Sequence, residues 1–325
     1  MNNYIVLDLE WNQGAGSSSG DGLTFEIIEI GAVKLNEKLE IIDGFHGLIR
    51  PVVHPELHFK IREMTKFTNA ELSAGGSFTE VFQSFLDWCG KDYIFCTWGS
   101  MDLEELQNNL DYYGLTNPFP KPFFYFDLQK LYGLSQGNAK DRFSLDSVVS
   151  ALGLPQEGQF HRALEDARYT ARVMKAMDFE RVKTYVSVDY HRPPRNRKEE
   201  IFIDFGSYSK FVSQIYDTKE DAMSDRKLTS TTCYVCGRTL RKKIRWFSSN
   251  AKFYFCLAIC PEHGFLKGKI RMKKAEGGRV FAVKTLKLVG QDGADAIKKK
   301  QEEQRKRRAI KRRIKLSAET GQSTK

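Results

Sequence analysis

The chain has 325 residues and a mass of 37.3 kDa, and its 41% hydrophobic and 12% aromatic content excludes intrinsic disorder, collagen and a coiled-coil rod. Its net charge of +10 is segregated, because residues 1–180 carry 26 acidic and 15 basic side chains whereas residues 226–289 carry 2 acidic and 16 basic ones. No apolar stretch approaches the roughly 20 residues that span a bilayer and the N-terminus lacks a signal pattern, so we expect a cytoplasmic protein without membrane contact.

The first 180 residues alternate between strand-like and helical patterns. Residues 4–10 form a short β-branched apolar run, and residues 25–35 and 39–50 are strand-like runs that the intervening residues would join as a hairpin. Hydrophobic spacing and capping residues then predict strands at 93–98 and 123–126, and helices at 78–89, 102–113, 144–153 and 162–177. A meander followed by alternating strands and helices indicates an α/β fold with a mixed sheet flanked by helices on both faces.

The remainder of the chain changes character three times. Pro193-Pro194 lies in a basic run without sustained periodicity, the cysteines crowd together beyond it, and the C-terminal residues are nearly all charged. We therefore expect a first domain at 1–182, a linker with connecting elements at 183–227, a small β-rich module at 228–289 and a basic helical or disordered tail at 290–325.

Acidic side chains stand at the ends of predicted elements in the first domain. Asp8 and Glu10 project from the same face of the first strand, since side chains two apart on a strand share a face. Asp102 follows the strand at 93–98, and Asp166 lies in the first turns of the helix after His161. Asp127 and Asp146 are rival acids, which we interpret as a helix cap and a solvated first-turn acid.

If the four carboxylates and His161 lie close together, they can hold divalent cations and activate a water molecule. Two carboxylates about 5 Å apart repel by on the order of 3 kcal/mol at an effective dielectric near 20, so four stay ionised together only with cations between them. Hard oxygen ligands select Mg²⁺ or Mn²⁺, and two such ions form a clamp for phosphodiester displacement. His161 is the histidine placed to accept a proton from the attacking water.

Three stretches carry a resemblance to a known family, the DEDDh 3′-to-5′ exonucleases. They are Val6-Leu7-Asp8-Leu9-Glu10-Trp11, Trp98-Gly99-Ser100-Met101-Asp102 and His161-Arg162-Ala163-Leu164-Glu165-Asp166-Ala167. The sequences of residues 25–33, 49–51 and 63–68 resemble those of one branch of this family. That branch contains the exoribonucleases that trim histone-mRNA and small-RNA ends, together with KapD-type proteins. The resemblance covers roughly residues 3–180.

The resemblance implies an RNase H-like fold, two Mg²⁺ or Mn²⁺ ions and release of nucleoside 5′-monophosphates from a free 3′ end. Carried over by residue, it makes Asp8, Glu10, Asp102 and Asp166 metal ligands and His161 the general base. It also suggests three substrate contacts, in stretches that differ from the family pattern. Trp11 stands where Thr is common, and Thr65-Lys66-Phe67-Thr68 differs from the usual Thr-Gly-Ile-Thr. Met64 and Phe67 either pack on the terminal base or belong to the core.

Two cysteine-bearing turns in the rear half have the spacing of a zinc ribbon. Cys233-Tyr-Val-Cys236 and Cys260-Pro-Glu-His263 flank a predicted hairpin at 246–259, and together they offer four ligands for a structural Zn²⁺. Cys256 is the alternative to His263 as the fourth ligand. A disulfide framework is disfavoured in a chain without a secretion signal.

Basic residues interleave with aromatic ones around these turns and dominate the tail. Such a pattern suits single-stranded nucleic acid, with attachment to ribosomal or other structured RNA as one form, although the aromatic residues could be only core and the tail only a solvated helix. Our hypothesis is a metal-dependent 3′-to-5′ exonuclease acting on single-stranded RNA. The alternatives are a DNA exonuclease using the same residues and a nucleic-acid-binding adaptor without turnover.

Overall fold

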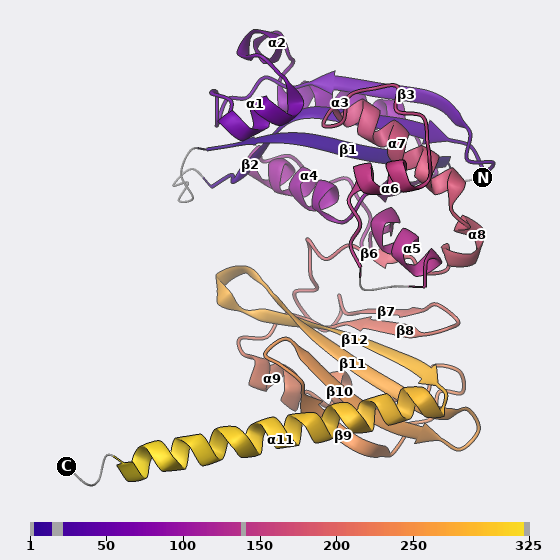
Figure 1. Cartoon of the computed structure of the whole chain (residues 1–325), viewed down its shortest axis with the longest axis vertical. Helices are drawn as coiled ribbons and strands as arrows, with labels where there is room; N and C mark the ends of the chain where they lie inside the picture. Colours follow the sequence, from indigo (N-terminus) through magenta and orange to yellow (C-terminus); the bar gives the residue numbers. More distant parts are fainter. Residues whose placement is uncertain (1–2, 15–21, 138–140, 322–325) are drawn as a thin grey trace. The chain divides into compact units, whose positions relative to one another are not determined.

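The chain forms two compact units, Met1–His191 and Arg192–Lys325, in a computed structural model that describes residues 3–14, 22–137 and 141–321 (Figure 1). The first unit extends beyond the predicted end at residue 182, because Ser187–Val188 forms a short strand, β6, that pairs with the first unit's sheet. Within the described part of the chain, no helix has the length and apolar character needed to cross a membrane.

The first unit is built on a six-stranded mixed sheet in the order β3-β2-β1-β4-β5-β6. The first three strands form the predicted antiparallel meander, β4 and β5 run parallel to β1, and β6 is antiparallel to β5. The strands preceding β6 are β1 (Asn3–Gln13), β2 (Phe25–Leu35), β3 (Ile41–Leu48), β4 (Tyr93–Thr97) and β5 (Phe124–Asp127).

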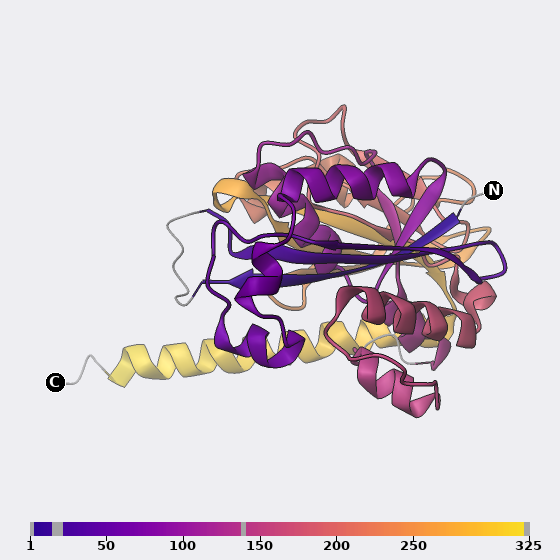
Figure 2. The ribbon, with the colours of Figure 1, turned by 90° about the horizontal axis from the view of Figure 1, so that it is seen from above.

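Helices lie on both faces of this sheet (Figure 2), as the sequence predicts for the RNase H-like fold. Four helices match predicted ones: α3 (Phe78–Cys89), α4 (Met101–Tyr112), α6 (Leu145–Ala151) and α7 (Ala163–Ala176). Three shorter helices were not predicted: α1 (Phe59–Thr65), α2 (Asn69–Ser73) and α8 (Phe179–Val182). A further short helix, α5 (Leu128–Ser135), follows the cap predicted at Asp127. Asp127 caps α5, since its side chain accepts the N–H of Lys130.

The alternation of β1 separates two hydrophobic cores. Ile5, Leu7 and Leu9 pack with the apolar face of α3 and α4, whereas Val6 packs on the opposite side with residues of α5, α6 and α7. Asp8 and Glu10 share the parity of Val6, so they lie on the face that α7 covers. The strand pattern that builds the cores therefore also directs the two acids toward α7.

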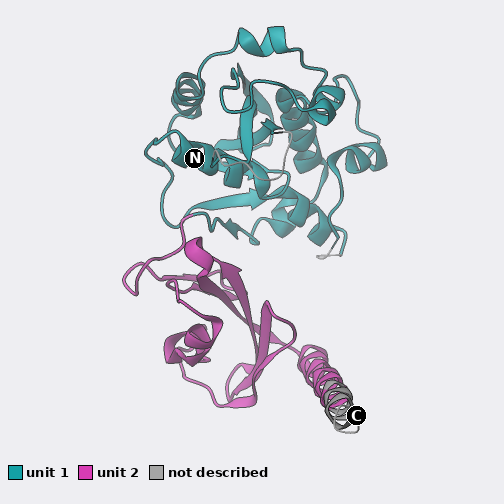
Figure 3. Cartoon of the chain, turned by 90° about the vertical axis from the view of Figure 1, so that its left-hand side faces the viewer, with its two compact units in different colours: residues 1–191 teal, residues 192–325 magenta. Residues whose placement is uncertain are grey.

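The second unit is a six-stranded antiparallel sheet in the order β7-β8-β12-β11-β10-β9 (Figure 3). Two short helices pack on one face and the long C-terminal helix contacts β10, β11 and β12. Its elements are β7 (Ile201–Asp204), β8 (Ser209–Val212), α9 (Lys219–Ser224), α10 (Arg226–Thr229), β9 (Lys242–Ser248), β10 (Phe253–Cys260), β11 (Gly264–Lys274), the 3-10 turn η1 (Glu276–Gly278), β12 (Val280–Val289) and α11 (Gln291–Gly321).

The predicted linker at 183–227 needs correction. Residues 201–212 form β7 and β8, which extend the second sheet through pairing of β8 with β12. Both strands are short, and their partner lies far along the chain, so no local periodicity reveals them. The rear unit is consequently larger than a zinc ribbon and has hydrophobic clusters of its own on both faces of the sheet.

Candidate active site and a second ligand cluster

Asp8 and Glu10 occupy the second half of β1, between β2 and β4. Asp8 is opposite Gly31 of β2 and Glu10 is opposite Glu29, after which a β-bulge shifts the register at Trp11. Because Gly31 has no side chain, the first turn of α7 packs directly on β2 at this point. This close approach brings the acids of β1 and the residues of α7 together.

The other two predicted acids begin helices that meet the same strand. Asp102 lies in the first turn of α4, where its Oδ1 accepts the N–H of Leu9 at 3.2 Å. Asp166 lies in the first turn of α7, where its Oδ2 accepts the N–H of His161 at 3.0 Å. Both carboxylates are largely buried, and the hydrogen bond from Leu9 ties the start of α4 to β1.

The structure brings the five predicted residues to one place. Potential ligand atoms of Glu10, His161 and Asp166 all lie within 4.8 Å of one another. Asp8 and Asp102 belong to the same electrostatic cluster, since the neighbouring acids that raise the pKa of Asp8, after its burial, are Asp102, Asp166, Glu10 and Glu29. His161 is exposed and has a φ of +65°, an uncommon conformation for a residue other than glycine.

Burial and mutual repulsion favour the protonated form of these carboxyl groups in the absence of cations. Burial, reinforced by neighbouring acids, raises the pKa of Glu10 to about 8 and raises that of Asp8 well above its ordinary value. Burial likewise raises the pKa of Asp102 and of Asp166 to about 7, although backbone N–H donors oppose the shift at both residues. Cations placed among the carboxylates would remove this penalty.

One atom of this cluster is an open acceptor. Asp166 Oδ1 is buried and, among the residues that the structure describes, has no hydrogen-bond partner. A buried carboxylate oxygen without a partner is costly unless a ligand satisfies it. Together with three further hard oxygen donors, this atom fits a Mg²⁺ or Mn²⁺ ion.

Glu29 is a buried acid at this site that the sequence analysis missed. Its Oε2 accepts the N–H of Ala163 at 2.9 Å, at the N-terminus of α7, and its Oε1 lies 2.7 Å from His46 Nε2 and 3.4 Å from Arg162. The negative charge therefore fixes the first turn of α7 onto β2. An acid within a run of residues buried on both faces is the signal that could have identified it.

Gly31→Ala is expected to displace α7 and to disrupt the site. A Cβ atom at this position would lie 2.0 Å from Leu164 N and 2.1 Å from Ala163 C, which are backbone atoms that cannot move alone. We expect a loss of at least about 2–3 kcal/mol in the free energy of unfolding, together with loss of divalent-cation binding at Asp166. Chemical denaturation and cation titration measure both. Gly44→Ala is the matched control, since its Cβ would find ordinary contacts at 3.8 Å or more, and an equal effect there would contradict the argument.

The three predicted substrate contacts have different surroundings. Phe67 is 1% exposed, packs in a core cluster with Ile28, and lies 4.3 Å beneath the guanidinium of Arg162, so it offers no free face to a base. These surroundings favour the core alternative for Phe67. Met64 is 44% exposed, and Trp11 is half-buried beside the first core with its ring 5.9 Å from that of Phe25.

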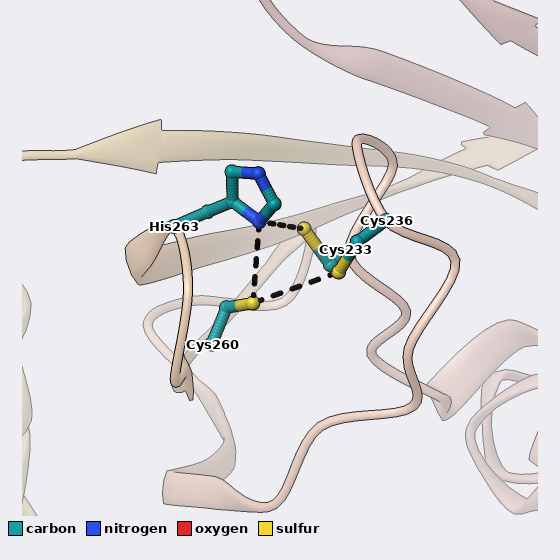
Figure 4. Close-up of side chains that lie close together, drawn as sticks. All are labelled: Cys233, Cys236, Cys260 and His263. Atoms are coloured by element: carbon teal, nitrogen blue, oxygen red, sulfur yellow. Dashed lines mark hydrogen bonds between the residues drawn. The ribbon is translucent and has the colours of Figure 1, made fainter.

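A second ligand cluster lies in the rear unit (Figure 4). Cys236 Sγ lies 3.7 Å from Cys260 Sγ, and His263 Nδ1 lies 3.7 Å from Cys233 Sγ and 3.5 Å from Cys260 Sγ. Ligands about 2.3 Å from a tetrahedral Zn²⁺ would be separated by about 3.8 Å, so these atoms have the spacing of a zinc site. Burial raises the pKa of the Cys260 thiol, but hydrogen bonds, first of all with His263, outweigh it and lower that pKa to about 6.

Cys256 is not part of this cluster. It is fully buried in β10, with its Sγ only 2.4 Å from where a Cβ of Gly268 would lie, and burial raises its thiol pKa to about 12. The four atoms that come together belong to Cys233, Cys236, Cys260 and His263. The alternative in which Cys256 replaces His263 is therefore wrong for this arrangement.

Comparison with protein families agrees with the geometry of the first unit. The exonuclease model named RNase T matches residues 5–174, which include all four acids and His161. The chain belongs to the RNase T exonuclease family. Similar curated proteins include a "DNA polymerase III PolC-type" of Clostridium perfringens, 30% identical over 57% of this chain and 12% of its own length, and human "ERI1 exoribonuclease 3", 30% identical over 47% and 48%.

Two further likenesses concern relatives of more similar length. "Probable 3'-5' exonuclease KapD" of Bacillus subtilis is 26% identical over 54% of this chain and 85% of its own length. The nuclease domain of 3′hExo, a DEDDh member solved with rAMP, has the same fold with a TM-score of 0.51 at 24% identity, over 58% of this chain and 96% of that domain. The chain spans about a tenth of the length of the PolC-type polymerases and about half of the length of the ERI1-type exoribonuclease.

Proposed function

We propose that the chain is a divalent-cation-dependent 3′-to-5′ exonuclease that releases nucleoside 5′-monophosphates from single-stranded RNA. The observation that carries this proposal is the convergence of Asp8, Glu10, Asp102 and Asp166 beside His161, with an unsatisfied buried oxygen on Asp166. Membership of the exonuclease family supports the same chemistry. A purely adaptor role would leave the cost of burying four acids without a function.

Each member of the site has a distinct role in this proposal. The four carboxylates hold two Mg²⁺ or Mn²⁺ ions, which activate a water and stabilise the leaving oxygen when bound. His161 accepts the proton of the attacking water, for which its exposed ring is accessible from solvent. Asp166 positions His161 through the backbone N–H of that residue. Trp11 and Met64 are candidates for contacts with the terminal nucleotide.

We favour RNA as the substrate because the match covers 48% of the length of human "ERI1 exoribonuclease 3". The match to the PolC-type DNA polymerase of Clostridium perfringens covers only 12% of that protein. DNA is the second candidate, since the PolC-type DNA polymerases are similar at the same level of identity. Competition between RNA and DNA oligonucleotides of one sequence, each with a free 3′ hydroxyl, distinguishes them. Preferential degradation of the DNA would overturn the RNA assignment while leaving the exonuclease proposal intact.

In the rear unit, we propose a structural Zn²⁺ held by Cys233, Cys236, Cys260 and His263. The sulfur and nitrogen separations and the lowered pKa of Cys260 support it, because thiolate is the ligand form at neutral pH. The excess of basic residues over residues 226–289 supports a nucleic-acid-anchoring role for this unit.

The deciding experiment is degradation of a 5′-labelled single-stranded RNA by the purified chain. We expect a ladder that shortens from the 3′ end, nucleoside 5′-monophosphate as product, and dependence on added Mn²⁺ or Mg²⁺. A block at the 3′ hydroxyl is expected to stop the reaction. Binding of the RNA without formation of product under these conditions would contradict the exonuclease proposal and support the adaptor alternative.

A further inference from the structure

One face of β11 carries a column of basic side chains. Leu266, Ile270 and Met272 point into the clusters on the side of α9, α10 and the cysteine turns. Side chains at the intervening positions therefore point to the opposite face, which α11 crosses. These are Phe265, Lys267, Lys269, Arg271 and Lys273, four of which are basic.

Neighbouring elements add aromatic rings and a further cation to this face. Phe253 of β10 pairs with Arg271, and both Lys269 and Arg271 lie over its ring, at 4.7 Å and 5.9 Å from the centroid. From α11, Lys300 lies 4.6 Å from the centroid of Phe255, the cross-strand partner of Lys269. Cations thus lie beside the half-buried ring of Phe253 and the buried ring of Phe255.

Among the described residues, no acid forms an ion pair with Lys267, Lys269 or Arg271, and residues 263–275 contain no Asp or Glu. Burial and the positive charges of Lys300 and neighbouring basic residues lower the pKa of Lys267 and of Lys269. Like charges held this close are destabilising, and an external polyanion would relieve their repulsion. By contrast, Arg238 and Arg197 of this unit each have an acidic partner, Glu262 and Asp225 respectively.

We propose that Lys267, Lys269 and Arg271, with the ring of Phe253, form a docking surface for the backbone of single-stranded RNA. This inference rests on the proposed function, for which it supplies the anchoring surface. Alternate residues of a strand are about 6.8 Å apart, which is comparable with the separation of successive phosphates in an extended single strand. Aromatic rings beside the cations favour nucleic acid over an acidic polypeptide, because bases offer faces that stack on the rings.

The test is the double variant Lys269→Gln/Arg271→Gln in the full chain. Both side chains are exposed, so the fold is expected to persist, which the thermal unfolding midpoint checks. The probe is a fluorescein-labelled oligouridylate of about 20 nucleotides. It is bound without added divalent cation, so that it is not degraded, and without a chelator, so that the zinc cluster is left untouched. Affinity is expected to fall on the order of tenfold, and the slope of log affinity against log salt to lessen by about 1.4, since two phosphate contacts are lost.

Lys219→Gln/Arg226→Gln is the matched control. It removes the same charge from α9 and α10, which cover the other face of the sheet. An equal loss of affinity and slope in the control, or no change in the test variant, would overturn the docking surface. So would displacement of the RNA by polyglutamate at equal charge concentration.

A separate readout keeps this inference distinct from the proposed function. Release of mononucleotides from a uridine trinucleotide in Mn²⁺ is expected to be the same in the parent chain and in Lys269→Gln/Arg271→Gln, because the trinucleotide is too short to need the anchor. If the parent chain releases no mononucleotide, the exonuclease proposal fails, while the salt dependence of binding still decides the docking surface.

Discussion

Asp8→Asn is expected to abolish hydrolysis and, in the cation-free protein at pH 8, to raise thermal stability. The loss of one ligand from the cation site removes several kcal/mol of transition-state stabilisation, which corresponds to a rate at least about 10³-fold lower. The gain in stability arises because asparagine has nearly the same shape but adds no charge to the buried cluster. Loss of activity with a gain in stability separates a functional acid from a structural one.

The pH dependence of stability explains why Asp8→Asn is expected to stabilise the cation-free protein at pH 8. Burial raises the pKa of Asp8 well above its ordinary value and that of Glu10 to about 8, so the folded protein binds protons that the unfolded chain has released. Such groups contribute stability below about pH 4, and that contribution is lost as the pH rises through the folded pKa values of about 7 to 8. Adding Mn²⁺ at pH 8 is expected to restore it.

Thermal unfolding at pH 5 and pH 8, with and without Mn²⁺, measures the effect, and each kcal/mol relieved is expected to raise the midpoint by about 2–4 °C. Asp146→Asn is the control, since Asp146 is an exposed acid in the first turn of α6 whose pKa is lowered by hydrogen bonding to Ser144. It should leave hydrolysis unchanged and give no gain at pH 8. Hydrolysis retained by Asp8→Asn would show that the chemistry lies elsewhere.

Cys260→Ser is expected to remove zinc and to destabilise the rear unit selectively. Cys260 ends β10, and Cys233 and Cys236 lie on the turn that precedes β9, so the ion would fasten that turn to the sheet. Loss of a structural metal costs about 4 kcal/mol or more, which corresponds to a fall of about 10 °C or more in the unfolding midpoint. The exonuclease-family unit has its own cores and should unfold as in the parent chain.

Zinc content per chain and calorimetric unfolding test this prediction. Cys256→Ser is the matched control, because Cys256 is a buried cysteine on the same strand that takes no part in the cluster. It should keep one zinc per chain and lose only about 1 kcal/mol from burial of a hydroxyl. Full zinc content in Cys260→Ser, or none in the parent chain, would contradict the proposed site.

Local periodicity predicted the elements that carry most of the core. The strand-like run at the start of the chain became β1, and the helical spacing of residues 78–89 became α3. Short helices such as α8, and the strands β7 and β8, were not predicted because their stability comes from contacts with distant segments rather than from their own pattern. The predicted linker was wrong for this reason.

Part of the candidate site could be predicted from the sequence. The shared face of Asp8 and Glu10 follows from strand geometry alone, whereas the approach of Asp166 depends on the packing of α7 against Gly31. Glu29 was missed because its role as an anchor for α7 is a tertiary contact. The sequence left two alternatives open for Phe67, because the residue that covers its ring, Arg162, lies far along the chain.

The two oxygen atoms of the Asp166 carboxylate have different surroundings, which would couple ion binding to the position of His161. One oxygen accepts the backbone N–H of His161 and the other has no hydrogen-bond partner among the described residues, so under the proposed mechanism one carboxylate would connect the proton acceptor with a bound ion. Rotation of this group would disturb both at once. Occupancy by the ion and alignment of the imidazole should therefore rise and fall together in a titration, as one concerted step.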